Sequence, residues 1–248
     1  LFAMLLLGIA PSVFAQTLST AAANFPSKPL KIVVPFGAGG IADLTARTVG
    51  AKMADILGQP VVIDNKPGAG GIAAGDLVAK SEPDGTTLLL MSNGTAVSAG
   101  LFKSLPYDTA KDFAPVSTLG FFDIILVTKT DSPFKTLAEI LAFAKTNPGK
   151  LNLGTINIGS TQNLAAELFK STAGISLQIV PFNGTPAVIT ALRGGQIDAA
   201  VEILGPVKTQ IDAKAIQALA VFGLKRSPSL PEVPTAKESG ITSMNAAS

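Results

Sequence analysis

Short apolar runs alternate with amphipathic helical stretches along most of this chain. The run at residues 30–34 is too short and too rich in β-branched side chains for a helix, which predicts a strand buried on both faces. A glycine-rich turn follows at 37–40, and residues 41–57 then place apolar side chains at helical spacing, with Gly58 suited to a C-terminal cap. A strand, a glycine turn and a helix start bring free backbone N–H groups to one point, where an anion can bind.

The alternation continues with two further predicted strands, at 60–64 and 86–91, and a helix between them that ends near residue 80. This βαβαβ order with short connections predicts a parallel sheet covered by helices on both faces. We interpret residues 92–95 as the turn that ends the third strand.

From about residue 113 the rhythm changes, and we interpret the apolar runs at 116–119 and 124–127 as the crossing into a second lobe. Beyond the crossing the alternation resumes. It predicts helices near 137–146, 162–171, 186–193 and 205–213, and strands near 151–155, 177–180, 198–203 and 216–221. The last stretch, 227–248, is rich in proline and polar residues and shows no closing element, so we expect a first lobe that lacks its C-terminal elements.

The first 15 residues are uncharged and mostly apolar, and residues 13–15 include small side chains where a signal peptidase reads. The apolar run is well short of the roughly 20 residues that span a membrane. We interpret residues 1–15 as the remnant of a secretory signal peptide and expect a periplasmic protein.

Composition narrows the chemistry further. Nineteen Lys and Arg against 17 Asp and Glu give a net charge of +2, which makes no case for a nucleic acid partner. The chain has no Cys and no His, which excludes disulfides, thiol nucleophiles, His-based catalytic triads and the common zinc sites. These absences favour a binding protein over an enzyme, and we expect no catalytic residue, cofactor or metal.

The sequence Gly-Ala-Gly-Gly-Ile-Ala occurs twice, at 37–42 and 68–73. Both copies can begin helices, although for the second we prefer the simpler interpretation that small residues allow close packing. The first copy also matches a relaxed dinucleotide-binding fingerprint, with Asp64 at the end of the next strand. That acid stands 27 residues beyond Gly37, farther than usual, so a dinucleotide-binding oxidoreductase is kept as the alternative.

The second predicted lobe supplies further turns that can bind an anion. Ser160 or Thr161 suits the N-cap of the helix that follows, and Gly184 and Thr185 precede a proline at a first helical position. Capping and ligand binding are compatible, because a helix start has more free N–H groups than its cap satisfies.

Two acidic residues near these turns are also candidates for ligand contact. Asp43 and Glu202 can each fix a ligand's ammonium or hydroxyl group. For Asp43 we prefer a structural role, since an acid in the first turn of a helix is stabilised by the helix dipole.

An ordered set of segments resembles the receptors of tripartite tricarboxylate transporters, also called Bug receptors. The segments cover nearly all of the chain after the leader: 25–29, 33–40 with Asp43, 58–62, 65–71, 83–89, 105–108, 111–116, 159–161, 194–198, 225–228 and 230–235. The chain departs from the family pattern at 182–185 and at Glu202.

The resemblance implies a two-lobed periplasmic-binding-protein type II α/β fold, each lobe a mostly parallel sheet flanked by helices. It places lobe I at 26–118 plus 224–248, incomplete at its C-terminus, and lobe II at 119–223. It further implies a monomer that captures a small carboxylate between the lobes and delivers it to the membrane components of the transporter. The ligand-binding residues that we expect are Phe36, Ala38, Gly39, Gly40, Asn93, Thr95, Ser160, Thr161, Gly184, Thr185 and Glu202.

Overall fold

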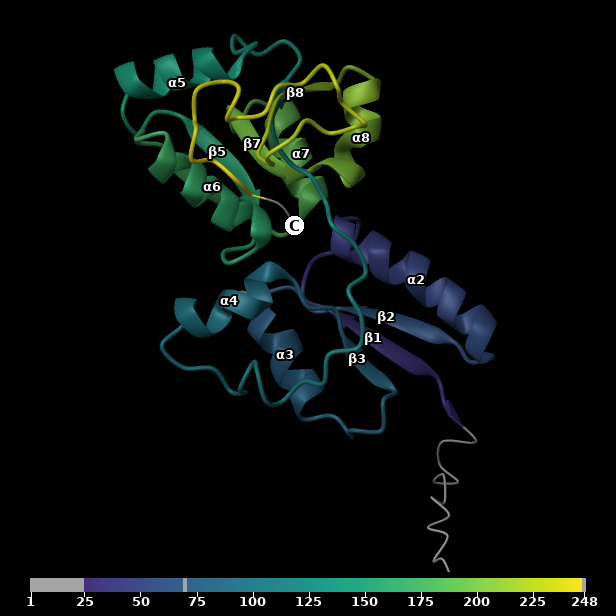
Figure 1. The fold of residues 1–248 in the computed structure, drawn as a ribbon. Helices are drawn as coiled ribbons and strands as arrows, with labels where there is room; N and C mark the ends of the chain where they lie inside the picture. The colour runs from purple at the N-terminus through teal and green to yellow at the C-terminus, as the bar shows by residue number, and fades with distance from the viewer. Residues whose placement is uncertain (1–24, 69–70, 247–248) are drawn as a thin grey trace, which may run out of the picture.

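The structure, a computed structural model, describes residues 25–68 and 71–246, which form two lobes placed one above the other (Figure 1). Each lobe is built on its own sheet, of three strands in the first and five in the second. The expected α/β fold is therefore confirmed. The signal-peptide remnant expected at 1–15 lies outside the described residues. Of the helices that the structure describes, each is too short or too polar to cross a membrane.

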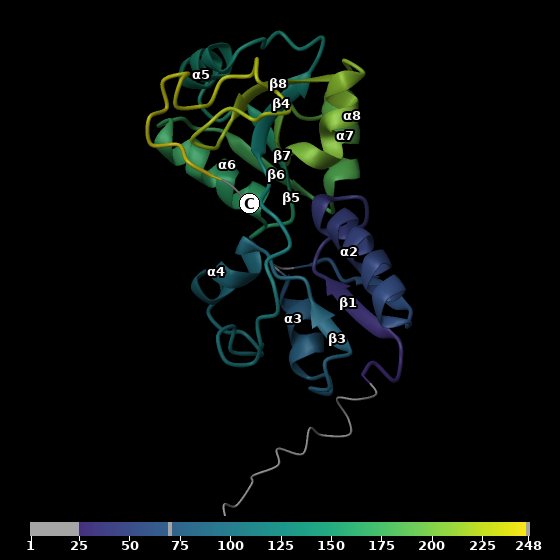
Figure 2. The ribbon, with the colours of Figure 1, turned by 45° about the vertical axis from the view of Figure 1, so that its right-hand side comes forward.

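The first lobe begins with the predicted βαβαβ unit. Its elements are β1 (Leu30–Val34), α2 (Ile41–Leu57), β2 (Val61–Asn65), α3 (Ile72–Ala79) and β3 (Thr87–Leu89). All pairs in this sheet are parallel, in the order β2-β1-β3. Helix α2 packs against β1 and β2, and α3 packs against β1 and β3, so the two helices lie on either side of the sheet (Figure 2).

A further helix, α4 (Asn93–Leu101), follows β3 where the sequence predicted only a turn. Its start is fixed by a capping box, in which the Ser92 hydroxyl accepts from the Thr95 N–H and the Thr95 hydroxyl accepts from the Ser92 N–H. Small and polar residues fill most of this helix. It therefore lacks the apolar stripe by which an amphipathic helix is predicted from a sequence.

Residues 113–123 run as an irregular segment from the first lobe to the second (Figure 1). The predicted run at 116–119 forms no strand, and its Val116 side chain is 83% exposed. The second run belongs to β4 (Ile124–Lys129), which begins the second lobe.

The second lobe forms a five-stranded sheet in the order β6-β5-β7-β4-β8. Its further elements are α5 (Leu137–Thr146), β5 (Asn152–Ile156), α6 (Thr161–Thr172), β6 (Gln178–Phe182), α7 (Thr185–Arg193), β7 (Ala199–Ile203), α8 (Leu204–Asp212) and β8 (Ile216–Val221). Strand β4 is antiparallel to both neighbours, whereas β5 pairs in parallel with β6 and β7.

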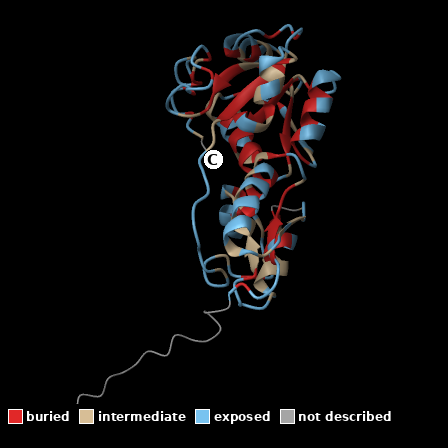
Figure 3. Ribbon diagram, turned by 90° about the vertical axis from the view of Figure 1, so that its right-hand side faces the viewer, coloured by how far each residue is buried: buried red, intermediate tan, exposed pale blue. Residues whose placement is uncertain are grey.

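Alternate side chains of β4 enter two cores on opposite faces of this sheet. Ile124 and Leu126 join a cluster that includes side chains of α5 and α6. Ile125 and Val127 join a second cluster with side chains of α7 and α8, which also takes in residues of β1 and α2 from the first lobe. Buried residues accordingly concentrate in the sheets and the helix faces turned toward them (Figure 3).

Residues 224–246 pack against the second lobe, which corrects their expected assignment to the first. The segment runs beside the edge strand β8, where Val221 donates to the Pro234 carbonyl and Ala236 donates to the Val221 carbonyl. Ile241 and Met244 enter the core beneath α6, and Leu230 and Val233 enter the core on the opposite face. The tail thus pairs with the last residue of the edge strand β8, and its apolar side chains complete the cores on both faces of the sheet.

Candidate functional site

The loop at residues 35–40 connects the carboxyl end of β1 to the first turn of α2. Gly40 is the N-cap of α2 and provides no side-chain hydrogen bond, so the first N–H groups of the helix lack a side-chain acceptor at the cap. Gly39 has a φ of 82°, a left-handed conformation that favours glycine. The loop therefore has the form that the sequence predicted for an anion-binding turn.

Asp43 holds this loop in place. Its Oδ2 accepts from the Gly39 N–H at 3.0 Å and from the Arg47 Nε at 3.0 Å. Arg47 also reaches Asn65 at 3.4 Å, and Asn65 donates to the Phe36 carbonyl at 3.0 Å. Burial acts to raise the pKa of Asp43, but the hydrogen bonds from Arg47, Gly39 and Asn65 and the Arg47 charge together lower it. The carboxylate therefore has a structural role, which was the preferred interpretation.

The loop lies directly against the start of α7 in the second lobe. A Cβ atom on Gly37 would stand 2.4 Å from the Asn183 carbonyl oxygen, so only glycine allows this approach. A Cβ atom on Gly40 would stand 3.6 Å from the Thr185 hydroxyl. Gly184, the N-cap of α7, again provides no side-chain hydrogen bond. Two helix starts from different lobes, both capped by glycine, therefore meet here.

A second contact between the lobes brings α4 against α6. A Cβ atom on Gly94 would stand 2.0 Å from the Gly159 carbonyl oxygen, which again requires glycine. Ser160 is the N-cap of α6, and its hydroxyl accepts from the Asn163 N–H at 3.1 Å. Side by side, the starts of α4 and α6 form the second half of the interlobe junction (Figures 1 and 2).

Glu202 connects the starts of α6 and α7 from within the sheet. It lies on β7 with no exposed surface, and its Oε2 accepts from the Thr185 hydroxyl at 3.0 Å, the Ile203 N–H at 3.3 Å and the Gln162 Nε2 at 3.4 Å. Its other oxygen, Oε1, is buried and has no hydrogen-bond partner among the described residues. Burial raises the pKa of Glu202 to about 7, since the hydrogen bonds from Gln162, Thr185 and Ile203 oppose the shift only in part.

Of the second Gly-Ala-Gly-Gly copy, residues 69 and 70 lie outside the described residues, and Gly71 packs beside the first copy. A Cβ atom on Gly71, the N-cap of α3, would stand 2.9 Å from Pro35 Cβ and 3.4 Å from the Thr95 hydroxyl. Close packing of small residues accounts for this contact, as the preferred interpretation of the second copy held.

The structure brings most of the expected ligand-binding residues to the junction, in two groups. The loop at 37–40 faces residues 183–186, whereas Ser160 faces the first turn of α4. Phe36, Gly40, Thr95, Ser160, Thr161, Thr185 and Glu202 are buried, and Ala38, Gly39 and Asn93 are exposed.

Three polar residues of the junction are not among the ligand-binding residues that the sequence predicted, and Arg47, expected to lie away from the loops, is one of them. Gln162 donates to the buried Glu202, and Asn65 and Arg47 support the 35–40 loop through hydrogen bonds to Phe36 and Asp43. The spacing of Asp43 and Arg47, four apart on a helix, is the one signal that could have indicated a pair.

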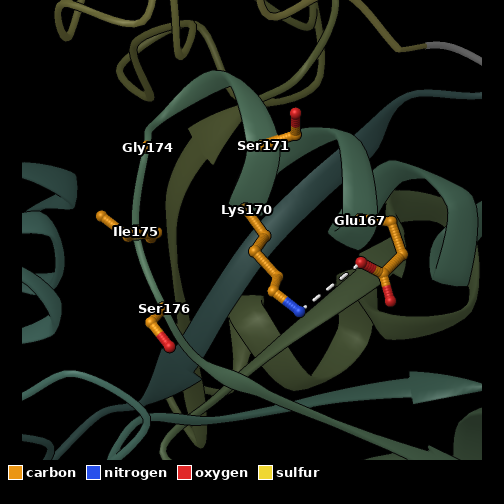
Figure 4. Close-up of a pocket in the computed structure, with 6 residues that line it drawn as sticks. All are labelled: Glu167, Lys170, Ser171, Gly174, Ile175 and Ser176. Atoms are coloured by element: carbon orange, nitrogen blue, oxygen red, sulfur yellow. Dashed lines mark ion pairs between the residues drawn. The ribbon is translucent and has the colours of Figure 1, made fainter.

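Two surface hollows lie away from the junction. One, of about 440 Å³, is lined by Glu167, Lys170, Ser171, Gly174, Ile175 and Ser176 at the far end of α6 (Figure 4). Its Lys170 and Glu167 are ion-paired at 3.8 Å, and the C-terminal end of a helix disfavours anions. The other, of about 340 Å³, lies beyond the end of α4.

This geometry does not favour the dinucleotide-binding alternative. The Gly39 N–H, which would face a pyrophosphate, donates to Asp43, and Asp64 is ion-paired with Lys66 at 3.3 Å. The second lobe lies against Gly37, where the fingerprint requires open space for the cofactor.

Comparison with known proteins gives matches over most of the chain. A family model described as the tripartite tricarboxylate transporter family receptor matches residues 45–248. A UPF0065 protein of Pseudomonas sp. strain P51 is 39% identical over 86% of this chain, and protein BugT of Bordetella pertussis is 36% identical over 94%. The chain spans 64% of the length of the first of these relatives and 70% of the second.

Solved structures of related proteins superpose on most of this chain. The periplasmic binding protein BugD superposes with a TM-score of 0.85 at 32% identity, over 90% of this chain and 75% of that protein. A Rhodopseudomonas palustris protein solved with adipate gives a TM-score of 0.85 at 32% identity, over 90% of this chain and 75% of that one. MatC of the same organism, solved with bound malate, gives 0.83 at 34% identity, over 90% and 76%.

Proposed function

Because this chain belongs to the tripartite tricarboxylate transporter receptor family, a family of solute-binding proteins rather than enzymes, we propose that it captures a small carboxylate between its lobes. The observation that carries this proposal is the meeting of helix starts from both lobes at one junction, α2 against α7 and α4 against α6. Related proteins solved with adipate and with malate support the same ligand class.

Backbone N–H groups replace the water that a bound carboxylate loses. The glycine caps of α2 and α7 leave first-turn N–H groups without a side-chain acceptor, and the helix dipoles favour negative charge at these positions. Charge-assisted hydrogen bonds contribute about 1.5–3 kcal/mol each, so a few of them give micromolar affinity after the ordering cost. Selectivity among acids then rests on the shape of the junction.

In this proposal the two groups at the junction act together. The exposed Ala38 and the buried Gly40 supply backbone N–H groups from the first lobe, with Phe36 as an apolar wall. Gly39 lies between them and contributes its exposed backbone surface, since its N–H donates to Asp43. The remaining contacts are Asn93 and Thr95 on α4, Ser160 and Thr161 on α6, Gly184 and Thr185 on α7, and Glu202 on β7.

The wider biological role is part of the same proposal. Export by a signal peptide places the protein in the periplasm, where BugD is described as a binding protein. The monomeric receptor then presents its carboxylate to the membrane components of a tripartite tricarboxylate transporter. No nucleotide, metal or catalytic step is required.

A thermal-shift screen of carboxylates, NAD and NADP tests the ligand class. We expect a carboxylate to raise the unfolding midpoint, with about 2.7 kcal/mol of added stability at one hundred times its Kd. The matched neutral amides, adipamide and malamide, should give no shift because they keep the shape and lose the charge. Stabilisation by NAD or NADP without stabilisation by any carboxylate would overturn the proposal in favour of the dinucleotide alternative.

A further inference from the structure

Glu202 is a fully buried acid at the junction, and no positively charged residue in the described part of the chain is ion-paired with it. Its Oε2 accepts hydrogen bonds from Thr185, Gln162 and Ile203, which use the capacity of that oxygen. Its Oε1 is buried without a partner among the described residues, and the Oε2 partners Gln162 and Thr185 belong to the first turns of α6 and α7. An unpartnered buried oxygen beside two helix starts indicates a group that meets a ligand.

We infer that Glu202 contacts the bound ligand as the neutral acid, with its Oε1–H donating to a ligand carboxylate, so that capture of the anion takes up one proton. This inference rests on the proposed function. The proton comes from the solvent and is held on Oε1 or shared with the ligand oxygen, and no covalent bond between heavy atoms forms or breaks.

The hydrogen bonds of Glu202 decide which oxygen carries the proton. Oε2 faces three donors and must remain an acceptor, so a proton on this carboxyl group belongs on Oε1. In this inference, the carboxylate held at the start of α7 lies next to that atom, because Thr185, the first residue of α7, donates to the same carboxyl group at 3.0 Å. Two carboxylates that share a buried site cannot both stay ionised, and the one with the raised pKa takes the proton.

The surroundings of Glu202 offer no charge that would hold it ionised. The groups that act on its pKa are neutral: burial raises the pKa to about 7, and Gln162, Thr185 and Ile203 lower it only in part. Charged groups on the elements packed nearby are either at the far ends of those elements or already paired. They include Lys129 on β4, Glu167 and Lys170 on α6, Arg193 on α7, Lys208 and Asp212 on α8, and Asp43 with Arg47 on α2. Two further acids flank the strands: the Asp123 carbonyl accepts from the Leu204 N–H, and the Asp198 carboxylate accepts from the Asn152 N–H. Both add only negative charge, which does not hold Glu202 ionised.

Isothermal titration calorimetry with adipate and with malate tests the coupling. Adipate has no hydroxyl or ammonium group, so its only charged contacts are through carboxylates. At about pH 8, titrations in two buffers of different ionisation enthalpy should show uptake of close to one proton per ligand. The affinity should fall about tenfold for each pH unit above 7.

Glu202→Gln provides the decisive variant, since its amide N–H replaces the Oε1–H and its carbonyl replaces Oε2. We expect it to bind with no proton uptake and with an affinity that does not change between about pH 6 and 8. It should also unfold at a higher temperature than the wild type at pH 8, because it removes a buried acid whose ionised form is disfavoured. Glu167→Gln, which removes an exposed carboxyl group from α6, should behave as the wild type.

Each contrary result has a definite meaning. Binding by the wild-type protein without proton uptake overturns the inference and leaves the proposed function intact. Uptake that persists in Glu202→Gln overturns the assignment to this residue. Failure of both acids to bind at every pH overturns the coupling together with their capture as ligands. Because uptake is measured on the wild type, a poorly folding variant does not affect the first test.

Discussion

Two acids at the junction show how neighbouring groups set the pKa of a buried carboxyl group. Asp43 and Glu202 are both buried, and burial acts to raise the pKa of each. Asp43 meets a guanidinium and a backbone N–H, so its pKa is lowered, whereas Glu202 meets only neutral donors and its pKa is raised to about 7. The first acid is thus suited to holding a loop, and the second to changing protonation when an anion arrives.

Replacing Asp43 with Asn should destabilise the protein by about 1–3 kcal/mol at neutral pH, because Arg47 and the Gly39 N–H lose a charged partner. Urea unfolding at several pH values measures the effect. An acid with a lowered pKa stabilises the fold above its unfolded pKa, and this stabilisation is lost as the pH falls through the folded pKa. The difference between wild type and Asp43→Asn should therefore be full at pH 6 and shrink below about pH 4.

The exposed Asp55 on the same helix supplies the control for this prediction. Asp55→Asn should change the stability by no more than about 0.5 kcal/mol. Equal effects of the two substitutions would show that Asp43 does not hold the loop.

At the scale of elements, the contacts between the lobes are made by the starts of four helices rather than by the sheets. Helices α2 and α7 approach through Gly37 and the 183–184 backbone, and α4 and α6 approach through Gly94 and Gly159. Each approach places backbone against backbone with no room for a side chain. The distance between the lobes is consequently set by glycines, and a methyl group at either contact must push the lobes apart.

Gly94→Ala should weaken binding of adipate or malate at least tenfold, since its Cβ would stand 2.0 Å from the Gly159 carbonyl oxygen. Calorimetry gives the affinity, and circular dichroism confirms that the helix content is kept. A variant that binds as tightly as the wild type would show that the α4–α6 contact does not form part of the site.

Gly100, on the same helix, is the matched control. A Cβ atom there would meet nothing within 4 Å. Gly100→Ala should leave the affinity unchanged and raise stability by about 0.5–1 kcal/mol, because alanine loses less conformational freedom in a helix.

At the scale of the whole molecule, the tail at 224–246 completes the packing of the second lobe. It runs beside β8 and contributes to the cores on both faces of the five-stranded sheet. Phe222, at the end of β8, stacks on Phe169 of α6 with ring centroids 5.4 Å apart, and it accepts a hydrogen bond from the Ala246 N–H. The tail is therefore a structural part of this lobe.

Met244→Ala tests this assignment. Met244 has no exposed surface, so the substitution should destabilise the protein by about 2–5 kcal/mol in chemical unfolding. Ser243→Ala, at the exposed neighbouring position, should stay within about 0.5 kcal/mol of the wild type. A Met244→Ala effect as small as that of the control would contradict packing of the tail into this core.

The sequence alone was enough for features that depend on neighbours along the chain. β1, α2, α5 and β8 have the predicted bounds, because apolar spacing, capping residues and glycine stops act within a few residues. The form of the 35–40 turn and the structural role of Asp43 follow from the same short-range rules. Helix α4 was missed because its composition gives no apolar stripe.

Only the tertiary structure decided which segments face one another. An apolar period shows that a face is buried but not what covers it, so the tail was assigned to the wrong lobe. The partners of Gly37 and Gly94 lie far away in sequence, and so do the Thr185 and Gln162 side chains that surround Glu202. The burial that raises the Glu202 pKa arises only when distant segments of the second lobe have folded around it, and no local pattern of residues records it.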